Sequence, residues 1–114
     1  MSKLPIEYLQ HILKECEYIT SVITEGSSKS ELLEDETLKR AVVRSIEIIG
    51  EASKKIPADV KVKWKEIQWR AMTGMRDKLI HDYMGVNYSI VWDVVKNKIP
   101  ALKKQIESII DKEG

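Results

Sequence analysis

Apolar residues recur every three or four positions along most of the chain, which is the period of an amphipathic α-helix. Pro5 suits the first turn of the first such helix, predicted over residues 5–25. Its apolar stripe consists of Ile6, Leu9, Ile12, Leu13, Cys16, Ile19, Val22 and Ile23. The pattern places Cys16 on the stripe, which predicts a core position, and His11 off it, which predicts exposure.

The second stretch of this pattern covers residues 35–55 and follows a predicted turn at residues 26–30. Ser28 and Glu31 have the spacing of a capping box, which predicts a short helical turn there. Asp35 is the candidate N-cap of the long second helix.

Gly50 lies in the middle of this second helix, where glycine costs about 1 kcal/mol relative to alanine. We therefore expect the backbone of another helix to approach closely at that point. Pro57 ends the helix, and residues 58–64 predict one or two further helical turns.

The third helix is predicted over residues 67–83, and Asn87 is the candidate N-cap of a fourth. The core side of the third helix would be formed by Ala71, Met72, Met75 and Leu79. The stripe of the fourth comprises Ile90, Val91, Val94, Val95, Ile99, Leu102, Ile106, Ile109 and Ile110. Pro100 should kink this helix or split it at Lys98 or Ile99. The sequence predicts an all-α fold with four main helices in an antiparallel bundle.

The chain of 114 residues predicts a single domain, 1–114, that can bury a core without covalent cross-links. Cys16 is the only cysteine, which excludes an internal disulfide and a cysteine-based zinc site within one chain. Apolar runs are at most three residues long and the N-terminal segment has no signal-peptide pattern. We therefore expect a cytoplasmic protein without a membrane span, metal or cofactor.

The net charge of +1 conceals an uneven distribution. Residues 54–78 hold eight basic and three acidic residues, a charge of +5, so the remainder carries −4. Such a segment fits either a polyanionic ligand or a solvated lysine-rich surface. Trp64 and Trp69 lie within it, and either pack against the core or stack on a base. Packing is the favoured interpretation, because large apolar side chains are most often buried.

The residues best suited to chemistry gather between positions 76 and 83. They are Arg76, Asp77, Lys78, His81, Asp82 and Tyr83. On a continuous helix, Asp77–His81 and Lys78–Asp82 are i,i+4 neighbours, and Arg76 and Tyr83 point in nearly the same direction. Arg76 and His81 are separated by roughly 140°, so they meet at one phosphate only through a local distortion or with a second copy of the chain.

This set of side chains suits cleavage of a phosphodiester by the RNA 2′-hydroxyl without a metal. His81 can transfer a proton near neutral pH, and Arg76 can pair with phosphate oxygens, with Lys78 as a further phosphate-binding candidate. Asp77 could fix the tautomer of His81. The spacing alone also fits an ordinary surface helix with i,i+4 ion pairs.

The motif and its surroundings resemble the HEPN superfamily in its HepT branch. Residues 76–83 match the Arg-x4-His-x-Tyr signature of that branch, and residues 48–52 its Ile-Gly-Glu-Ala segment. Residues 67–76 resemble the approach to the signature, and residues 87–102 resemble the fourth helix. The ordered set extends over almost the whole chain, from about residue 6 to residue 110.

The resemblance implies a toxin of a toxin–antitoxin pair, a homodimeric helical bundle that acts as a metal-independent ribonuclease on RNA. Its antitoxin partner would be an MNT-type nucleotidyltransferase that transfers AMP to the motif tyrosine. By position, Arg76 and His81 would be catalytic and Tyr83 the modified residue. Asp77 stands where the family more often has asparagine, which leaves open a non-catalytic HEPN module that binds nucleotide or the partner.

Overall fold

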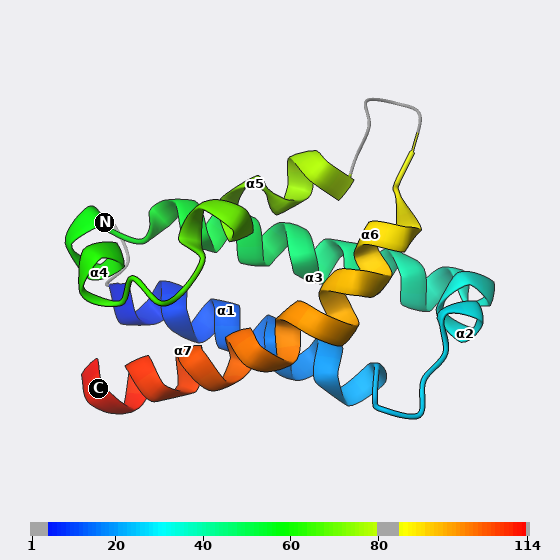
Figure 1. The fold of residues 1–114 in the computed structure, drawn as a ribbon, viewed down its shortest axis with the longest axis horizontal. Coiled ribbons are helices and arrows are strands. Elements are labelled where there is room, and N and C mark those ends of the chain that lie inside the picture. The colour runs from blue at the N-terminus through cyan, green and yellow to red at the C-terminus, as the bar shows by residue number, and fades with distance from the viewer. Residues whose placement is uncertain (1–4, 80–84, 114) are drawn as a thin grey trace.

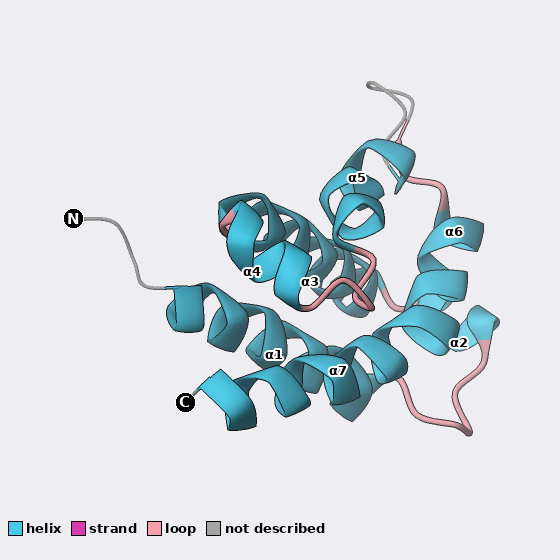
Figure 2. Ribbon diagram, turned by 60° about the vertical axis from the view of Figure 1, so that its left-hand side comes forward, coloured by secondary structure: helices cyan, strands magenta, loops and turns pink. Residues whose placement is uncertain are grey.

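The computed structural model describes residues 5–79 and 85–113, and every regular element in these two ranges is helical (Figure 2). The elements are α1 (Pro5–Val22), α2 (Lys29–Glu34), α3 (Glu36–Lys55), α4 (Ala58–Lys63), α5 (Trp69–Leu79), α6 (Tyr88–Asp93), the π-helical turn η2 (Val94–Lys98) and α7 (Ile99–Glu113). The predicted all-α class is confirmed. Each described helix is too short or too polar to traverse a lipid bilayer.

The long helices run in alternating directions, as expected for an antiparallel bundle (Figure 1). α1 packs against both α3 and α7, and α3 also packs against α5. The predicted fourth helix is divided into α6, η2 and α7, and the short helices α2 and α4 flank α3 in the chain. α1 begins and α7 ends at one end of the molecule, whereas α5 ends and α6 begins at the other (Figures 1 and 2).

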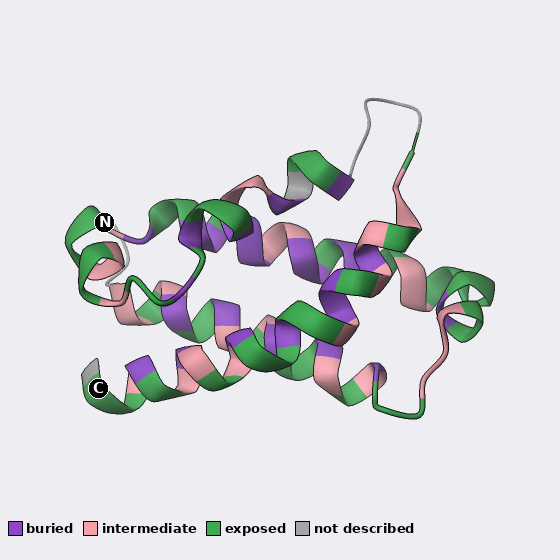
Figure 3. Ribbon diagram, in the orientation of Figure 1, coloured by how far each residue is buried: buried purple, intermediate pink, exposed green. Residues whose placement is uncertain are grey.

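The core is formed by the apolar stripes that the sequence pattern predicts (Figure 3). Residues with no exposed surface include Ile12, Cys16, Ile19, Val42, Ile46, Ile49, Val91, Ile99, Ile106 and Ile109. They come from α1, α3, α6 and α7. Because burying such a side chain contributes roughly 1.5–3 kcal/mol, these stripes stabilise the packing of α1 against its two neighbours.

The predicted helix caps are confirmed. The side chains of Ser28, Asp35 and Asn87 accept hydrogen bonds from backbone N–H groups in the first turns of α2, α3 and α6. The hydroxyl of Ser28 also donates to the carboxylate of Glu31 at 3.1 Å. Pro57 precedes the first residue of α4, as predicted, so α3 and α4 are separate helices.

The close helix crossing predicted at Gly50 is present between α3 and α5. A Cβ atom on Gly50 would lie 3.2 Å from the backbone carbonyl oxygen of Met72. That distance is shorter than an ordinary van der Waals contact, and a helix backbone cannot rotate away as a side chain can. Gly50 therefore sets how closely α5 lies against α3.

The division near Pro100 is confirmed and takes the form of one π-helical turn. In η2 the N–H of Ile99 bonds to the carbonyl oxygen of Val94, five residues back. Pro100 follows in the first turn of α7, where its missing N–H is tolerated. A π turn inside a longer helix is a local insertion that often lies near a functional site.

α1 ends at Val22, three residues before the predicted end at Glu25. The Nζ atom of Lys96, which extends from η2, donates to the carbonyl oxygens of Thr24 and Glu25 at 3.0 and 3.2 Å. The hydroxyl of Ser27 accepts from the N–H of Thr24 at 3.0 Å. These contacts hold the end of α1 as a turn, and the cation lies where the negative end of a helix dipole favours it.

α5 begins at Trp69, two residues after the predicted start at Ile67. Ile67 is buried, and the indole N–H of Trp69 donates to the carbonyl oxygen of Trp64 at 3.1 Å. The half-buried ring of Trp64 lies beneath the ammonium groups of Lys63 and Lys112, at 5.4 and 5.2 Å from its centre. Trp69 is buried and Trp64 packs against the core, which confirms packing as the favoured interpretation.

Candidate functional site

α5 carries the first half of the predicted motif. Met75 and Leu79, four residues apart, are both buried and fix one face of the helix against the core. Arg76 follows directly after Met75, and the side chains of Asp77 and Lys78 are exposed. The packing of α5 therefore depends on apolar residues and leaves these two charged side chains open to solvent.

The second half of the motif, His81 and Tyr83, lies outside the described residues. The predicted helix continues to Tyr83, whereas the described part of α5 ends at Leu79. The predicted neighbour pairs Asp77–His81 and Lys78–Asp82 therefore stay predictions.

A backbone hydrogen bond joins the end of α5 to the start of α6. The N–H of Asn87 donates to the carbonyl oxygen of Leu79 at a distance of 2.8 Å. Just before this point, Gly85 has a φ of 106°, in the left-handed region that glycine adopts without strain. The end of α5 at Leu79 and the residue that caps α6, Asn87, are therefore hydrogen-bonded neighbours in space.

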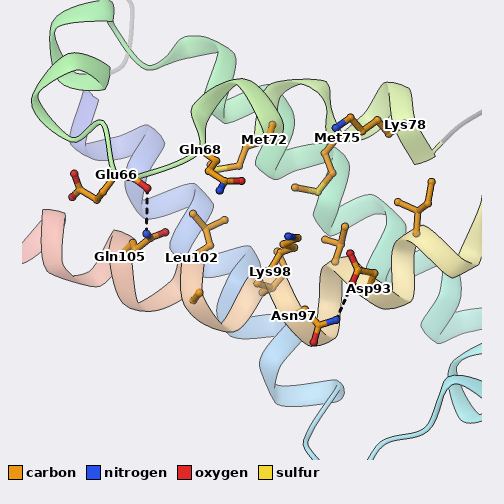
Figure 4. A pocket seen from close by; sticks show the side chains of 15 residues that line it. Glu66, Gln68, Met72, Met75, Lys78, Asp93, Asn97, Lys98, Leu102 and Gln105 are labelled. Carbon is orange, nitrogen blue, oxygen red and sulfur yellow. Dashed lines mark hydrogen bonds between the residues drawn. The ribbon is translucent and has the colours of Figure 1, made fainter.

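A groove of about 400 Å³ lies between α5 and the run of α6, η2 and α7 (Figure 4). Its apolar lining comes from Ala71, Met72, Met75, Ile90, Val94, Ile99, Ala101 and Leu102. Polar side chains stand along it; Asn97 donates to the carboxylate of Asp93 at 2.8 Å. Lys78 lines the end of the groove nearest the motif. The groove is thus an open apolar surface that adjoins the candidate site.

A second concave surface lies on the other flank of Lys78. Its basic residues are Lys61, Lys65, Arg70 and Lys78, and Gly74 lies among them. We call this surface the basic hollow. The sequence places these residues in one basic stretch but indicates a role for Lys78 alone, because only the folded chain brings Lys61 and Lys65 to the same concave surface as Lys78.

Cys16 and His11 behave as the sequence predicts. Cys16 has no exposed surface, and burial, followed by the charge of Glu15, raises the pKa of its thiol to about 12 from the ordinary 9.0. Such a thiol stays protonated and is unsuited to act as a nucleophile. His11 is exposed on α1. Among residues 5–79 and 85–113, no three His, Cys, Asp or Glu side chains converge as metal ligands would.

The fold and the position of the motif define a class: an all-α antiparallel bundle whose third long helix leads into an Arg-x4-His-x-Tyr segment. The family described as "Ribonuclease HepT-like" matches residues 9–109. The chain belongs to this HepT-like ribonuclease family.

Several relatives resemble the chain over most of its length. A protein of Caldanaerobacter subterraneus subsp. tengcongensis named "Putative RNase" is 47% identical over 97% of this chain and 98% of its own. The "Probable ribonuclease HepT" of Thermococcus cleftensis is 45% identical over 90% of this chain and 93% of its own. A "Putative RNase" of Methanocaldococcus jannaschii is 44% identical, over 94% and 88% respectively. No solved structure is significantly similar to the chain.

Proposed function

We propose that this protein is the toxin of a toxin–antitoxin pair and cleaves RNA as a metal-independent endoribonuclease. The observation that carries the proposal is the family match over residues 9–109, which contains the whole motif from Arg76 to Tyr83. The relatives named as RNases cover nearly the full chain and support the same activity.

Arg76 and His81 are the proposed catalytic residues. The guanidinium of Arg76 pairs with non-bridging oxygens of the scissile phosphate. His81 takes the proton of the adjacent 2′-hydroxyl, and that oxygen forms a bond to phosphorus while the bond to the 5′-oxygen breaks. The products are a 2′,3′-cyclic phosphate and a 5′-hydroxyl. The proton of this hydroxyl comes from His81 of a second copy of the chain. Asp77 would accept a hydrogen bond from the ring of His81 and fix its tautomer.

The need for a second motif leads to a homodimer with two-fold symmetry. His81 follows Arg76 by five positions, which corresponds to a separation of roughly 140° on a helix, so one copy alone brings them together only with a distortion. The open apolar groove beside α5, lined in part by Met75 and Val94, is a surface that a second copy could cover. Light scattering should give a dimer at micromolar concentration, and a fully active monomer would contradict this assembly.

The antitoxin in this proposal is an MNT-type nucleotidyltransferase that transfers AMP to Tyr83. Tyr83 follows Arg76 by seven residues, so both would point the same way on a helix. An AMP phosphate at that position would pair with Arg76 and occupy the place of the substrate phosphate.

The test is cleavage of RNA by the purified protein with EDTA present. Wild type should cleave, and a substrate with 2′-deoxyribose at the scissile position should stay intact. His81→Ala should lower the rate by about 10²–10⁴-fold, the usual contribution of general acid–base catalysis. His11→Ala is the matched control, because His11 is the other histidine and is exposed on α1. A fully active His81→Ala protein, or activity that EDTA abolishes, would contradict the mechanism.

One residue favours a second candidate, a module that binds nucleotide or the partner without cleaving RNA. Asp77 adds a negative charge beside the proposed phosphate site, where it would repel the substrate. If wild type binds RNA without cutting it and Asp77→Asn gains cleavage, this second function is supported.

A further inference from the structure

Gly74 lies in the middle of α5, and no contact within the described chain accounts for it. Glycine inside a helix costs about 1 kcal/mol relative to alanine. At Gly50 the close carbonyl oxygen of Met72 explains that cost. At Gly74, by contrast, an added Cβ would meet no atom of the described residues within 4 Å apart from its chain neighbours and its own helix backbone, and the backbone has no positive φ. The open space beside Gly74 is therefore the feature to be explained.

The side chains around this space are cations. Arg70, Gly74 and Lys78 follow one another at intervals of four residues and so form one ridge of α5. Lys61 and Lys65 complete the basic hollow from the segment before α5. No acid lines the hollow among the described residues. Its four cations also form no ion pair with any acid in the described parts of the chain.

The hollow leads to the candidate site. Arg70 and Lys78 are separated by about 12 Å along the helix axis, and Lys78 also lines the groove next to the motif. A negatively charged chain that entered at Lys61 would pass Arg70 and Gly74 before it reached Lys78. Without a side chain at Gly74, such a strand can approach the helix backbone closely between two cations.

We propose that the basic hollow binds the phosphate backbone of an RNA strand that flanks the cleavage position. The inference rests on the proposed function for its choice of RNA as ligand. It adds Lys61, Lys65 and Arg70 as phosphate-binding residues and Gly74 as the position that lets the strand reach the helix. Because the contacts are to phosphate, they hold the substrate without reading its sequence.

A second copy of the chain is the competing explanation for an open glycine on a helix. A symmetric contact through the hollow would bring its four cations against the same four in the partner, and like charges in contact are destabilising. A polyanion has the opposite charge along its whole length. The charge of the hollow therefore favours RNA as its occupant.

The first test is binding of a short single-stranded 2′-O-methyl RNA, followed by fluorescence anisotropy at several salt concentrations. The probe lacks the 2′-hydroxyl nucleophile, so binding is measured whether or not the protein proves to be a nuclease. Lys61→Gln with Arg70→Gln is compared with Lys14→Gln with Lys104→Gln. Each pair removes two positive charges, but Lys14 and Lys104 are exposed outside the hollow.

The double variant in the hollow should weaken binding and reduce the slope of log affinity against log salt by about 1.4, or about 0.7 for each lost phosphate contact. The control pair should change the slope by much less. Equal effects of the two pairs, or an unchanged slope in the hollow variant, would overturn the proposal.

The second test is Gly74→Ala, which adds one methyl group to the open space. RNA affinity should fall several-fold, while the thermal unfolding midpoint does not fall and the oligomeric state does not change. Unchanged RNA affinity would overturn the role of Gly74. Loss of a dimer with RNA affinity intact would assign the glycine to a contact between copies and would likewise overturn it.

Discussion

The backbone N–H of Asn87 lies 2.8 Å from the carbonyl oxygen of Leu79, so one hydrogen bond joins the end of α5 to the start of α6. Leu79 is fully buried, and the side chain of Asn87 caps α6. The bond therefore links a residue fixed in the core to a residue fixed by a helix cap.

Asn87→Ala should destabilise the protein by about 1 kcal/mol. The side-chain oxygen of Asn87 accepts hydrogen bonds from the N–H groups of Ser89 and Ile90 at 3.1 and 3.3 Å, and alanine offers no acceptor. Urea denaturation measures the change. Asn97→Ala is the matched control, because Asn97 is exposed and its side chain bonds to the side chain of Asp93 and caps no helix. If the two variants lose equal stability, the cap contributes no more than an exposed side-chain hydrogen bond.

Gly50→Ala should destabilise the protein although alanine is the better helix former. The new Cβ would lie 3.2 Å from the carbonyl oxygen of Met72, so α3 and α5 would have to move apart by a few tenths of an ångström. Overpacking of this kind costs about 1–3 kcal/mol, which exceeds the gain in helix propensity of about 1 kcal/mol. Thermal unfolding provides the measurement, and a raised midpoint would contradict the close crossing. Gly74→Ala, on the open side of α5, is the control and should not lower the midpoint.

Cys16 should make stability depend on alkaline pH. Burial raises the pKa of its thiol to about 12, so above the ordinary value of 9.0 the unfolded chain loses a proton that the folded chain keeps. Stability is therefore complete below about pH 9 and falls as the pH rises towards about 12. Between about pH 8 and pH 10, wild type should lose about 1.4 kcal/mol more than Cys16→Ala. Parallel pH profiles from urea denaturation would exclude this contribution.

Tyr83→Phe should stay folded and active as a nuclease but escape neutralisation by AMP transfer. Phenylalanine keeps the ring and removes the oxygen that would accept the nucleotide. Intact mass after incubation with the partner nucleotidyltransferase and ATP should show added AMP on wild type alone. Tyr18→Phe, which alters an exposed tyrosine on α1, should be labelled like wild type. Equal labelling of Tyr83→Phe would place the acceptor elsewhere.

The sequence predicted those parts of the fold that depend on neighbouring residues. The caps at Ser28, Asp35 and Asn87 were predictable because each acts on N–H groups within three residues of itself. The end of α1 at Val22 was not, because part of what fixes the turn after it is Lys96, whose partner Thr24 lies 72 residues away in the chain. The π-helical form of η2 could not be predicted from the sequence pattern either, since Pro100 indicates a break in the helix but not the geometry of that break.

The candidate site was likewise predictable only where its residues are close together in the sequence. Arg76, Asp77 and Lys78 could be chosen from their spacing, because they are neighbours on one helix. Lys61 could not be connected with Lys78, because the two lie on separate helices, α4 and α5, and only the folded chain brings them to one concave surface.

The arrangement of the chain ends has a practical consequence. α1 begins and α7 ends on the side of the bundle away from the junction where α5 ends and α6 begins (Figure 1). A fluorescent tag, an affinity handle or a second folded module joined at either terminus would therefore extend away from that junction. Surface immobilisation through such a tag presents the face with the junction to solution, which suits single-molecule and biosensor assays.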